Sequence, residues 1–194
     1  PDSVVFYDKK YAVTAIADEA FSLNSILESV VISEGVTTLG NRAFYNCENL
    51  RSIYIPSTLE KGNFSYNYNY INNEYAFLGC TGLEKITVAD GHPFLDSRND
   101  CNALIYKLNG GGVELMMGCK NTVIPDGVTQ IAPWAFYQTG VEKIIIPNSV
   151  TKIGEGAFNS CYNLTSLHIG SGLTEFAIYN NPNTGLAENL HNAI

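Results

Sequence analysis

The sequence predicts one solenoid of stacked coils, built from short parallel strands and short helical turns and interrupted by an inserted β-hairpin. One pattern, V-T-x-I-G-x-x-A-F-x-x-C-x-x-L-x-x-I-x-I, recurs along most of the 194 residues and is cleanest over residues 150–170. Its L-x-x-I-x-I segment alternates as a half-buried strand does, and the Pro that often follows cannot extend a ladder. A single unit of this kind cannot bury its own apolar residues, so neighbouring units must stack.

Five copies of the pattern align on an Ala-Phe pair. The pairs are Ala20-Phe21, Ala43-Phe44, Ala76-Phe77, Ala135-Phe136 and Ala157-Phe158. Successive phenylalanines are 23 and 22 residues apart in the regular stretches, and 33 and 59 apart where insertions enter. A period in the low twenties is typical of leucine-rich repeats. The predicted fold class is therefore a β-rich leucine-rich-repeat solenoid, an α/β repeat, forming a single domain over residues 1–194.

Two copies carry nearly the whole motif. The first comprises Val36-Thr37-Thr38-Leu39-Gly40, Ala43-Phe44, Cys47, Leu50, Ile53 and Ile55-Pro56. The second comprises Val150-Thr151-Lys152-Ile153-Gly154, Ala157-Phe158, Cys161, Leu164, Leu167 and Ile169. These units resemble the repeats of the BspA-like (Treponema pallidum type) family of bacterial secreted and surface proteins. The resemblance covers about residues 13–174 and implies a right-handed solenoid, an extracellular or cell-surface location, and adhesion or molecular recognition without catalytic residues.

The charge balance excludes several partners. Nineteen acidic and 11 basic residues give a net charge of −8, and no basic stripe is present, so nucleic acid and anionic lipid are not expected as partners. No apolar run approaches the roughly 20 residues that a membrane span needs. No signal segment opens the chain, so secretion would need one that was removed or lies outside this sequence.

The coils and insertions divide the chain into seven parts. Residues 1–12 are expected to form a hairpin that caps the stack, and residues 177–194 a C-terminal cap or a truncated repeat. Regular coils are expected over residues 13–59, 76–88 and 122–176. A Tyr/Asn-rich insertion occupies residues 60–75, and a hairpin insertion occupies residues 89–121.

Tyr66, Tyr68 and Tyr70 alternate with Asn in the first insertion. Alternation with a period of two places three side chains on one face of an extended segment. An exposed row of aromatic rings could stack on a sugar or grip a partner chain. Alternatively, the rings fold down onto the edge of the solenoid and the asparagines stabilise turns.

The second insertion predicts a hairpin that counts as one expanded coil. Ala103 to Leu108 and Val113 to Met117 are two apolar runs that flank Asn109-Gly110-Gly111-Gly112. The repeat resumes at Thr122-Val123-Ile124-Pro125. We therefore expect six strands in one ladder, about 24 Å long at ~4.8 Å per strand.

The strands offer a candidate binding face. In L-x-x-I-x-I the leucine and isoleucines point inward, so the x positions face outward. The last outward position is occupied, coil by coil, by Val31, Tyr54, Thr87, Val123, Ile145 and His168. We predict that Tyr54, Thr87, Ile145 and His168 contact a protein partner. Alternatively, these residues are present for strand propensity alone.

Cysteine spacing suggests packing and one disulfide. Cys47, Cys80 and Cys161 lie at the motif position where a small apolar side chain packs beneath the turn. Extending the hairpin pairing outward brings Cys101 opposite Cys119, which permits a disulfide in an oxidising compartment. No spacing typical of a zinc site is present, and none of the common catalytic or phosphate-binding motifs occurs. No metal, cofactor or catalytic residue is predicted.

The predicted function is non-catalytic binding by a secreted or cell-surface bacterial protein. Protein recognition or adhesion through the strand face is the leading hypothesis, with a host or bacterial surface protein as partner. A glycan bound by the Tyr66 row is the alternative. A structural spacer in a larger surface protein is the third hypothesis.

Overall fold

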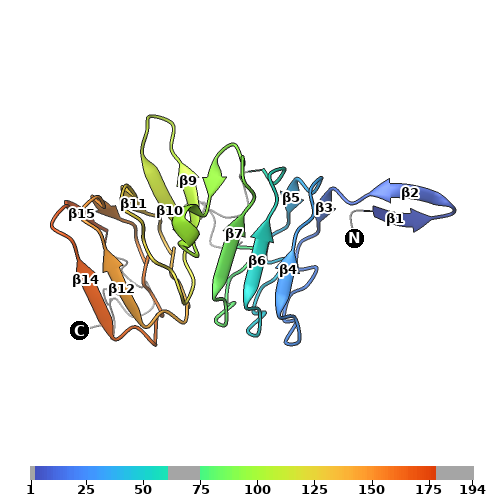
Figure 1. The fold of residues 1–194 in the computed structure, drawn as a ribbon. Helices are drawn as coiled ribbons and strands as arrows, with labels where there is room; N and C mark the ends of the chain where they lie inside the picture. Colours follow the sequence, from blue (N-terminus) through green and yellow to red (C-terminus); the bar gives the residue numbers. More distant parts are fainter. Residues whose placement is uncertain (1–2, 61–74, 178–194) are drawn as a thin grey trace.

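The computed structural model describes residues 3–60 and 75–177 (Figure 1). Its first elements are β1 (Ser3–Phe6), β2 (Lys9–Ala12), β3 (Ala15–Ile16), β4 (Ser29–Val31), β5 (Thr38–Leu39), β6 (Ser52–Ile55) and β7 (Lys85–Val88). The inserted block contributes β8 (Leu95–Asp96), the 3-10 helix η1 (Arg98–Asp100), β9 (Leu104–Lys107) and β10 (Val113–Met117). The last elements are β11 (Gln130–Ile131), β12 (Lys143–Ile146), β13 (Lys152–Ile153), β14 (Ser166–Ile169) and β15 (Glu175–Phe176).

The coils stack through two ladders of parallel strands. The L-x-x-I-x-I segments form a ladder in which β4, β6 and β7 pair side by side, as do β12 and β14. The V-T-x-I segments form a second ladder, with β3 beside β5 and β10-β11-β13-β15 in that order. Parallel strands one repeat apart confirm the predicted leucine-rich-repeat solenoid.

The first ladder is shorter than predicted. Thr122 to Pro125 form no strand, so three strands and two strands replace the expected six. The Val88 N–H donates to Ser97 Oγ at 3.0 Å, and the Val123 N–H donates to the Cys101 carbonyl oxygen at 3.0 Å. The segment 97–101, which contains η1, thus occupies the bonds that would have joined the two halves of the ladder.

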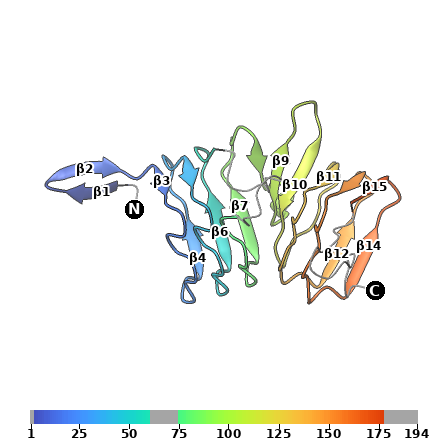
Figure 2. The same cartoon turned by 180° about the vertical axis from the view of Figure 1, so that it is seen from behind.

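The inserted hairpin has the predicted turn but joins the second ladder. The Leu108 N–H donates to the Gly112 carbonyl oxygen at 2.9 Å, closing the Asn109–Gly111 loop as expected. β9 and β10 pair antiparallel, β8 pairs antiparallel with β9, and β10 continues in parallel into β11. The hairpin rises above the coils in Figures 1 and 2.

The amino-terminal hairpin does not cover the first coil. β1 and β2 pair antiparallel around Tyr7 and Asp8, whose φ angles of 49° and 58° suit a two-residue hairpin turn. The hairpin extends away from the coils (Figures 1 and 2), and the β2 side chains are exposed. Phe21 in the first coil is therefore still 43% exposed. The predicted cap is wrong because β2 has no buried apolar face to pack on that coil.

In place of the predicted helical turn, the Ala-Phe pair lies in a corner bonded to the next coil. In the second coil the residues two before and two after Phe44, Arg42 and Asn46, have left-handed φ angles of 53° and 52°. Glu19 and Leu23, Trp134 and Gln138, and Gly156 and Ser160 repeat this pair in other coils. The Phe44 N–H donates to the Ala76 carbonyl oxygen at 2.7 Å. The corners thereby form a third set of bonds between coils.

The phenylalanines stack along the core. Phe44 lies between Phe21 and Phe77, with ring centroids 5.1 Å away on each side, and Phe136 stacks on Phe158 at 5.0 Å. Such pairs contribute about 0.5–1.5 kcal/mol each beyond their buried area. The stack breaks between Phe77 and Phe136, where the inserted block enters and the buried residues divide into two clusters.

Candidate binding surface

Val31, Tyr54 and Thr87 lie side by side on the outer face of the β4-β6-β7 sheet. The strand register pairs Val31 with Tyr54 and Tyr54 with Thr87. The alternate residues Ile53 and Ile55 are only 2% and 0% exposed, so they point into the core. Val31 is 75% exposed, and Tyr54 and Thr87 are half-buried. The predicted direction of these side chains is confirmed.

Ile145 and His168 form the corresponding pair on the β12-β14 sheet. The two residues are register partners, and Ile145 is 68% exposed between the buried Ile144 and Ile146. Val123 is also exposed but belongs to the irregular segment before β11. We refer to Val31, Tyr54, Thr87, Ile145 and His168 as the outward column. The structure divides it into two parts, each on its own sheet.

A hollow of about 570 Å³ lies beside Thr87, between β7 and the inserted block. Its polar lining includes Asp90, Asp96, Arg98 and Lys107. The Asp96 carboxylate accepts hydrogen bonds from the Arg98 guanidinium, at 2.9 Å from Nε and at a shorter distance from Nη2. Partial burial would raise the pKa of Asp96, but the hydrogen bonds and charge of Arg98 outweigh burial and lower it. The negative charge of Asp96 thus balances the positive charge of Arg98, and the hollow offers polar contacts beside the outward column.

His92 is a buried residue at the base of this hollow. The side chain is 3% exposed, and its Nε2 lies 2.9 Å from the Leu59 carbonyl oxygen. Its Nδ1 accepts from the N–H groups of Phe94 and Leu95, at 3.3 and 3.1 Å. This pattern requires a neutral ring with the proton on Nε2. Burial lowers the pKa of His92, which matches a structural role in fastening the inserted block to the second coil.

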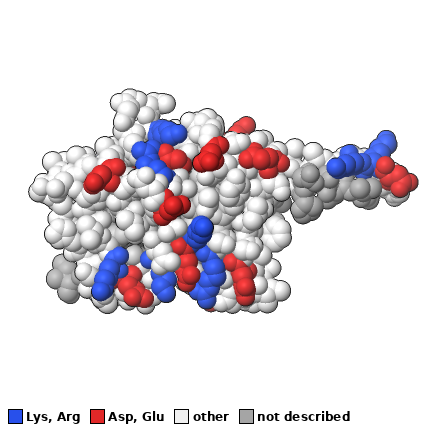
Figure 3. Space-filling model, viewed as in Figure 1, with Lys and Arg blue, Asp and Glu red and all other residues white. Residues whose placement is uncertain are grey.

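Charged side chains of both signs alternate along the lower edge of this face in Figure 3. Arg51 Nη1 lies 3.4 Å from Glu84 Oε1. An exposed pair of this kind contributes about 0–1 kcal/mol to stability. Mostly uncharged side chains cover the area above this edge (Figure 3). The outward column is therefore bordered by a mixed charge pattern.

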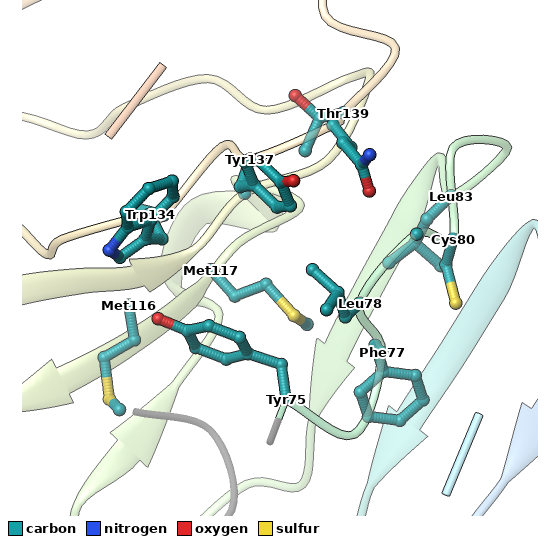
Figure 4. A pocket seen from close by; sticks show the side chains of 14 residues that line it. Tyr75, Phe77, Leu78, Cys80, Leu83, Met116, Met117, Trp134, Tyr137 and Thr139 are labelled. Atoms are coloured by element: carbon teal, nitrogen blue, oxygen red, sulfur yellow. The ribbon is translucent and has the colours of Figure 1, made fainter. Parts of the chain in front are cut away.

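A second space marks the break in the phenylalanine stack. A cavity of about 40 Å³ lies among Phe77, Leu78, Met117 and Tyr137, and Figure 4 shows Met117 and Leu78 between the two rings. The cavity has about the volume of a water molecule or two, so it is too small for an organic ligand. It is a packing defect where the inserted block replaces a regular corner.

A family model matches the carboxy-terminal part of the repeat array. This model, described as a BspA type leucine rich repeat region (6 copies), matches residues 115–188. The same spacing and the same bonds between corners continue through the coils of Phe21, Phe44 and Phe77. Residues 115–188 of this chain therefore carry BspA-type leucine-rich repeats. Most of the recurring apolar positions of the repeat are buried, as the sequence predicted, whereas Phe21 and Ile169 in the outermost coils are 43% and 40% exposed.

Several solved structures are similar to this chain. A leucine rich cell surface protein of Faecalibacterium prausnitzii shares 20% identity over 90% of this chain and 69% of its own, with a TM-score of 0.42. A leucine-rich repeat protein of Eubacterium ventriosum shares 18% over 85% of this chain and 57% of its own, at 0.48. One from Bacteroides ovatus shares 22% over 91% of this chain and 38% of its own, at 0.43. A comparison with curated protein sequences finds no significant match.

The remaining predicted sites have mixed outcomes. Tyr66, Tyr68 and Tyr70 lie outside the described residues of this protein, so their role stays a prediction. Cys101 and Cys119 are buried free thiols, and no bond joins them. A β-bulge between Leu115 and Met117 pairs Met117 with Leu104, which shifts Cys119 opposite Asn102. The predicted register of the two cysteines is wrong for this reason, and the Cys119 thiol donates to the Asn102 carbonyl oxygen instead, at 3.1 Å.

Within residues 3–60 and 75–177, no three His, Cys, Asp or Glu side chains are grouped so as to hold a metal ion. No helix in this part of the chain is long and apolar enough to cross a membrane. The Cys47, Cys80 and Cys161 thiols instead donate to the Phe21, Phe44 and Phe136 carbonyl oxygens, at 3.1, 3.1 and 2.9 Å. These three cysteines therefore fasten each coil to the one before it.

Proposed function

We propose that this leucine-rich-repeat domain is a non-catalytic binding module that recognises another protein through the outward column. The observation that carries the proposal is the exposure of large apolar side chains on the strand face. Val31 and Ile145 are 75% and 68% exposed; Ile145 lies between the buried Ile144 and Ile146, and Val31 lies between the half-buried Val30 and the buried Ile32. Solenoids commonly bind their partners on the surface that their stacked strands form. Exposed apolar side chains rimmed by polar residues are typical of such interfaces.

The two sheets suggest two contact regions. Thr87 borders the hollow lined by Asp96 and Arg98, and Tyr54 is the register partner of Thr87, so this region combines an aromatic ring with polar groups. The β12-β14 region combines Ile145 with the imidazole of His168. A partner that spans the segment 97–101 would contact both regions, whereas a small partner would contact only one.

A binding screen against extracellular proteins tests the proposal. Ile145→Asp places a charge in the centre of one region, and we expect at least a tenfold loss of affinity for a true partner. Ile26→Asp is the matched control, because Ile26 is 85% exposed but lies outside the outward column. Tyr54→Ala tests the other region. A partner whose binding is unchanged by both column variants would contradict the proposal, and a spacer would bind no partner.

We also propose that the domain acts outside the cytoplasm, secreted or on the cell surface, as the repeat family suggests. An antibody against the folded domain should then label intact bacteria that produce it. Labelling that appears only after permeabilisation would contradict this location. A host or bacterial surface protein is the partner class that the location makes accessible.

A further inference from the structure

A polar hollow of about 230 Å³ runs across four coils on the side of the corners, away from the outward column. Its residues occupy two motif positions, two and four residues after each phenylalanine. The first position contributes Asn46, Gly79, Gln138 and Ser160, and the second contributes Glu48, Thr81, Gly140 and Tyr162. We call this hollow the corner groove. Thr139 and Asn163 complete its lining.

Glycines keep the corner groove open. A Cβ on Gly140 would lie 3.0 Å from the Thr81 carbonyl oxygen, and one on Gly79 would lie 1.9 Å from Asn46 Oδ1. The Gly79 φ of +77° repeats the left-handed conformation of Asn46, Gln138 and Ser160. At Gly79 and Gly140 the base of the corner groove is therefore backbone, and side chains from the coils on either side form its walls. Here Thr81 of the Phe77 coil lies beside Gly140 of the Phe136 coil.

Apart from Glu48, the side chains that line the groove are uncharged, and many of them carry hydrogen-bond donors or acceptors. Three amides, from Asn46, Gln138 and Asn163, each carry a donor and an acceptor group. The Thr81 hydroxyl adds a donor and an acceptor, and Glu48 adds a carboxylate acceptor. The hydroxyls of Thr139 and Ser160 donate to the Phe136 carbonyl oxygen and to Asn159 Oδ1, so they offer acceptor oxygens. Among the described residues no lysine or arginine lines the groove, and the Cβ and Cδ atoms of Lys120 lie close to Gly140. From these lining residues an anionic ligand would meet one carboxylate and no cation.

An aromatic ring completes the groove at one end. Tyr162 is 75% exposed, so its ring face is available to a ligand. Its hydroxyl donates to Ser160 Oγ at 3.4 Å, and Ser160 Oγ in turn donates to Asn159 Oδ1 at 2.7 Å. An amphipathic ring with a polar tip suits a ligand that is apolar on one face and hydroxylated on its edge.

We propose that the corner groove binds a neutral saccharide. A pyranose ring has a C–H face for Tyr162 and a rim of hydroxyls that both donate and accept, as the amides require. The groove extends over three coil steps, about 14 Å at ~4.8 Å per step, which favours a short oligosaccharide over a single sugar. Hydroxyl-poor apolar ligands would leave the amides unpaired, which is unfavourable. This site is separate from the outward column and does not depend on protein recognition.

Titration of the whole domain with cellotriose, maltotriose, mannotriose and chitotriose, followed by NMR or calorimetry, tests the proposal. We expect at least one trisaccharide to bind, with at least a tenfold weaker affinity in Tyr162→Ala and in Gln138→Leu. Tyr162→Phe keeps the ring and should retain most of the affinity. Tyr7→Ala is the matched control, because Tyr7 is an equally exposed tyrosine on the amino-terminal hairpin, at 83%.

Two outcomes would overturn the proposal. The first is the absence of binding to all four sugars at millimolar concentration. The second is binding that survives both Tyr162→Ala and Gln138→Leu, which would place the sugar elsewhere, for example on the Tyr66 row. Unchanged melting temperatures of the variants would show that a loss of affinity reflects contact and not unfolding. Because Tyr162 is 75% exposed, we expect Tyr162→Ala to leave the melting temperature almost unchanged.

Discussion

Gly118 takes the place of a stacking phenylalanine against Phe136. Its N–H donates to the Ala135 carbonyl oxygen at 2.8 Å, the same bond that the Phe44 N–H makes to Ala76. A Cβ on Gly118 would lie 2.2 Å from Phe136 Cε1, so no side chain fits there. The inserted block thus continues the hydrogen bonds between corners without contributing a phenylalanine, because the Phe136 ring fills the space beside Gly118.

Gly118→Ala should therefore destabilise the domain by about 1–3 kcal/mol, the usual cost of overpacking a filled core. Urea denaturation followed by circular dichroism measures this change. Gly112→Ala is the control, because its nearest contact is the flexible end of Leu108 at 3.0 Å, and we expect less than about 1 kcal/mol. Equal losses in both variants would show that the contact with Phe136 is unimportant.

The phenylalanine stack predicts unequal effects of truncation. Phe44 is 2% exposed and stacked on both faces, so Phe44→Ala should cost about 3–5 kcal/mol. Phe21 is 43% exposed and stacks only on Phe44 among its described neighbours, so Phe21→Ala should cost less than half as much. The same denaturation experiment compares them. A larger loss for Phe21→Ala would mean that the first coil is covered in solution.

The repeat, the buried residues and the outward side chains could all be predicted from sequence, because they follow from a period of 22 or 23 and from alternation within a strand. Ile144 and Ile146 are buried and Ile145 is exposed for that reason alone. Strand pairing across the second insertion could not be predicted. Ile124 is buried as its motif position requires, yet Ser97 and Cys101 accept the hydrogen bonds that would have linked Val88 and Val123 into one ladder.

The corner groove also escaped the sequence analysis. Its residues flank the motif cysteine, at positions that vary from coil to coil and therefore looked like ordinary solvent-exposed turns. A signal was present, since Gly79 and Gly140 stand where other coils carry side chains. It becomes meaningful only when the coils of Phe77 and Phe136 are known to be neighbours, which the 59-residue spacing between them conceals.

His92 predicts a loss of stability at mildly acidic pH. Burial lowers the pKa of His92 in the folded protein, with a further lowering by Lys107 that a hydrogen bond to Leu59 and the charge of Glu34 only partly oppose. The unfolded chain therefore takes up this proton near the ordinary value of 6.5, and the folded protein only at lower pH. The contribution is fully present above pH 6.5 and is lost as the pH falls below it.

Urea midpoints measured between pH 7.5 and pH 5 check this prediction. The wild-type midpoint should fall across that range, and His92→Gln should remove this part of the pH dependence while lowering stability at pH 7.5. Asp96 titrates further down, since its lowered pKa places its effect below the ordinary value of 3.8. A wild-type midpoint that does not change between pH 7.5 and 5 would contradict a neutral, buried His92.

All five cysteines should be free and unreactive in the folded protein. Each is buried, and burial raises the pKa of Cys119 and of Cys161 to about 11, so both are protonated at pH 7. A hydrogen bond with Cys80 lowers the pKa of Cys47 to about 7, but the Cys47 side chain is 0% exposed, so a reagent in solution does not reach this thiol in the folded protein. Without reductant, dithionitrobenzoate should react slowly with the native domain and with five thiols after unfolding in urea. Three thiols instead of five would indicate one disulfide. The double variant Cys101→Ser/Cys119→Ser would then locate it: three thiols in this variant would mean that the bond joined Cys101 and Cys119, and one thiol would mean that it lies elsewhere. Five reactive thiols would confirm that the bulge at Leu115 and Met117 keeps Cys101 and Cys119 out of register.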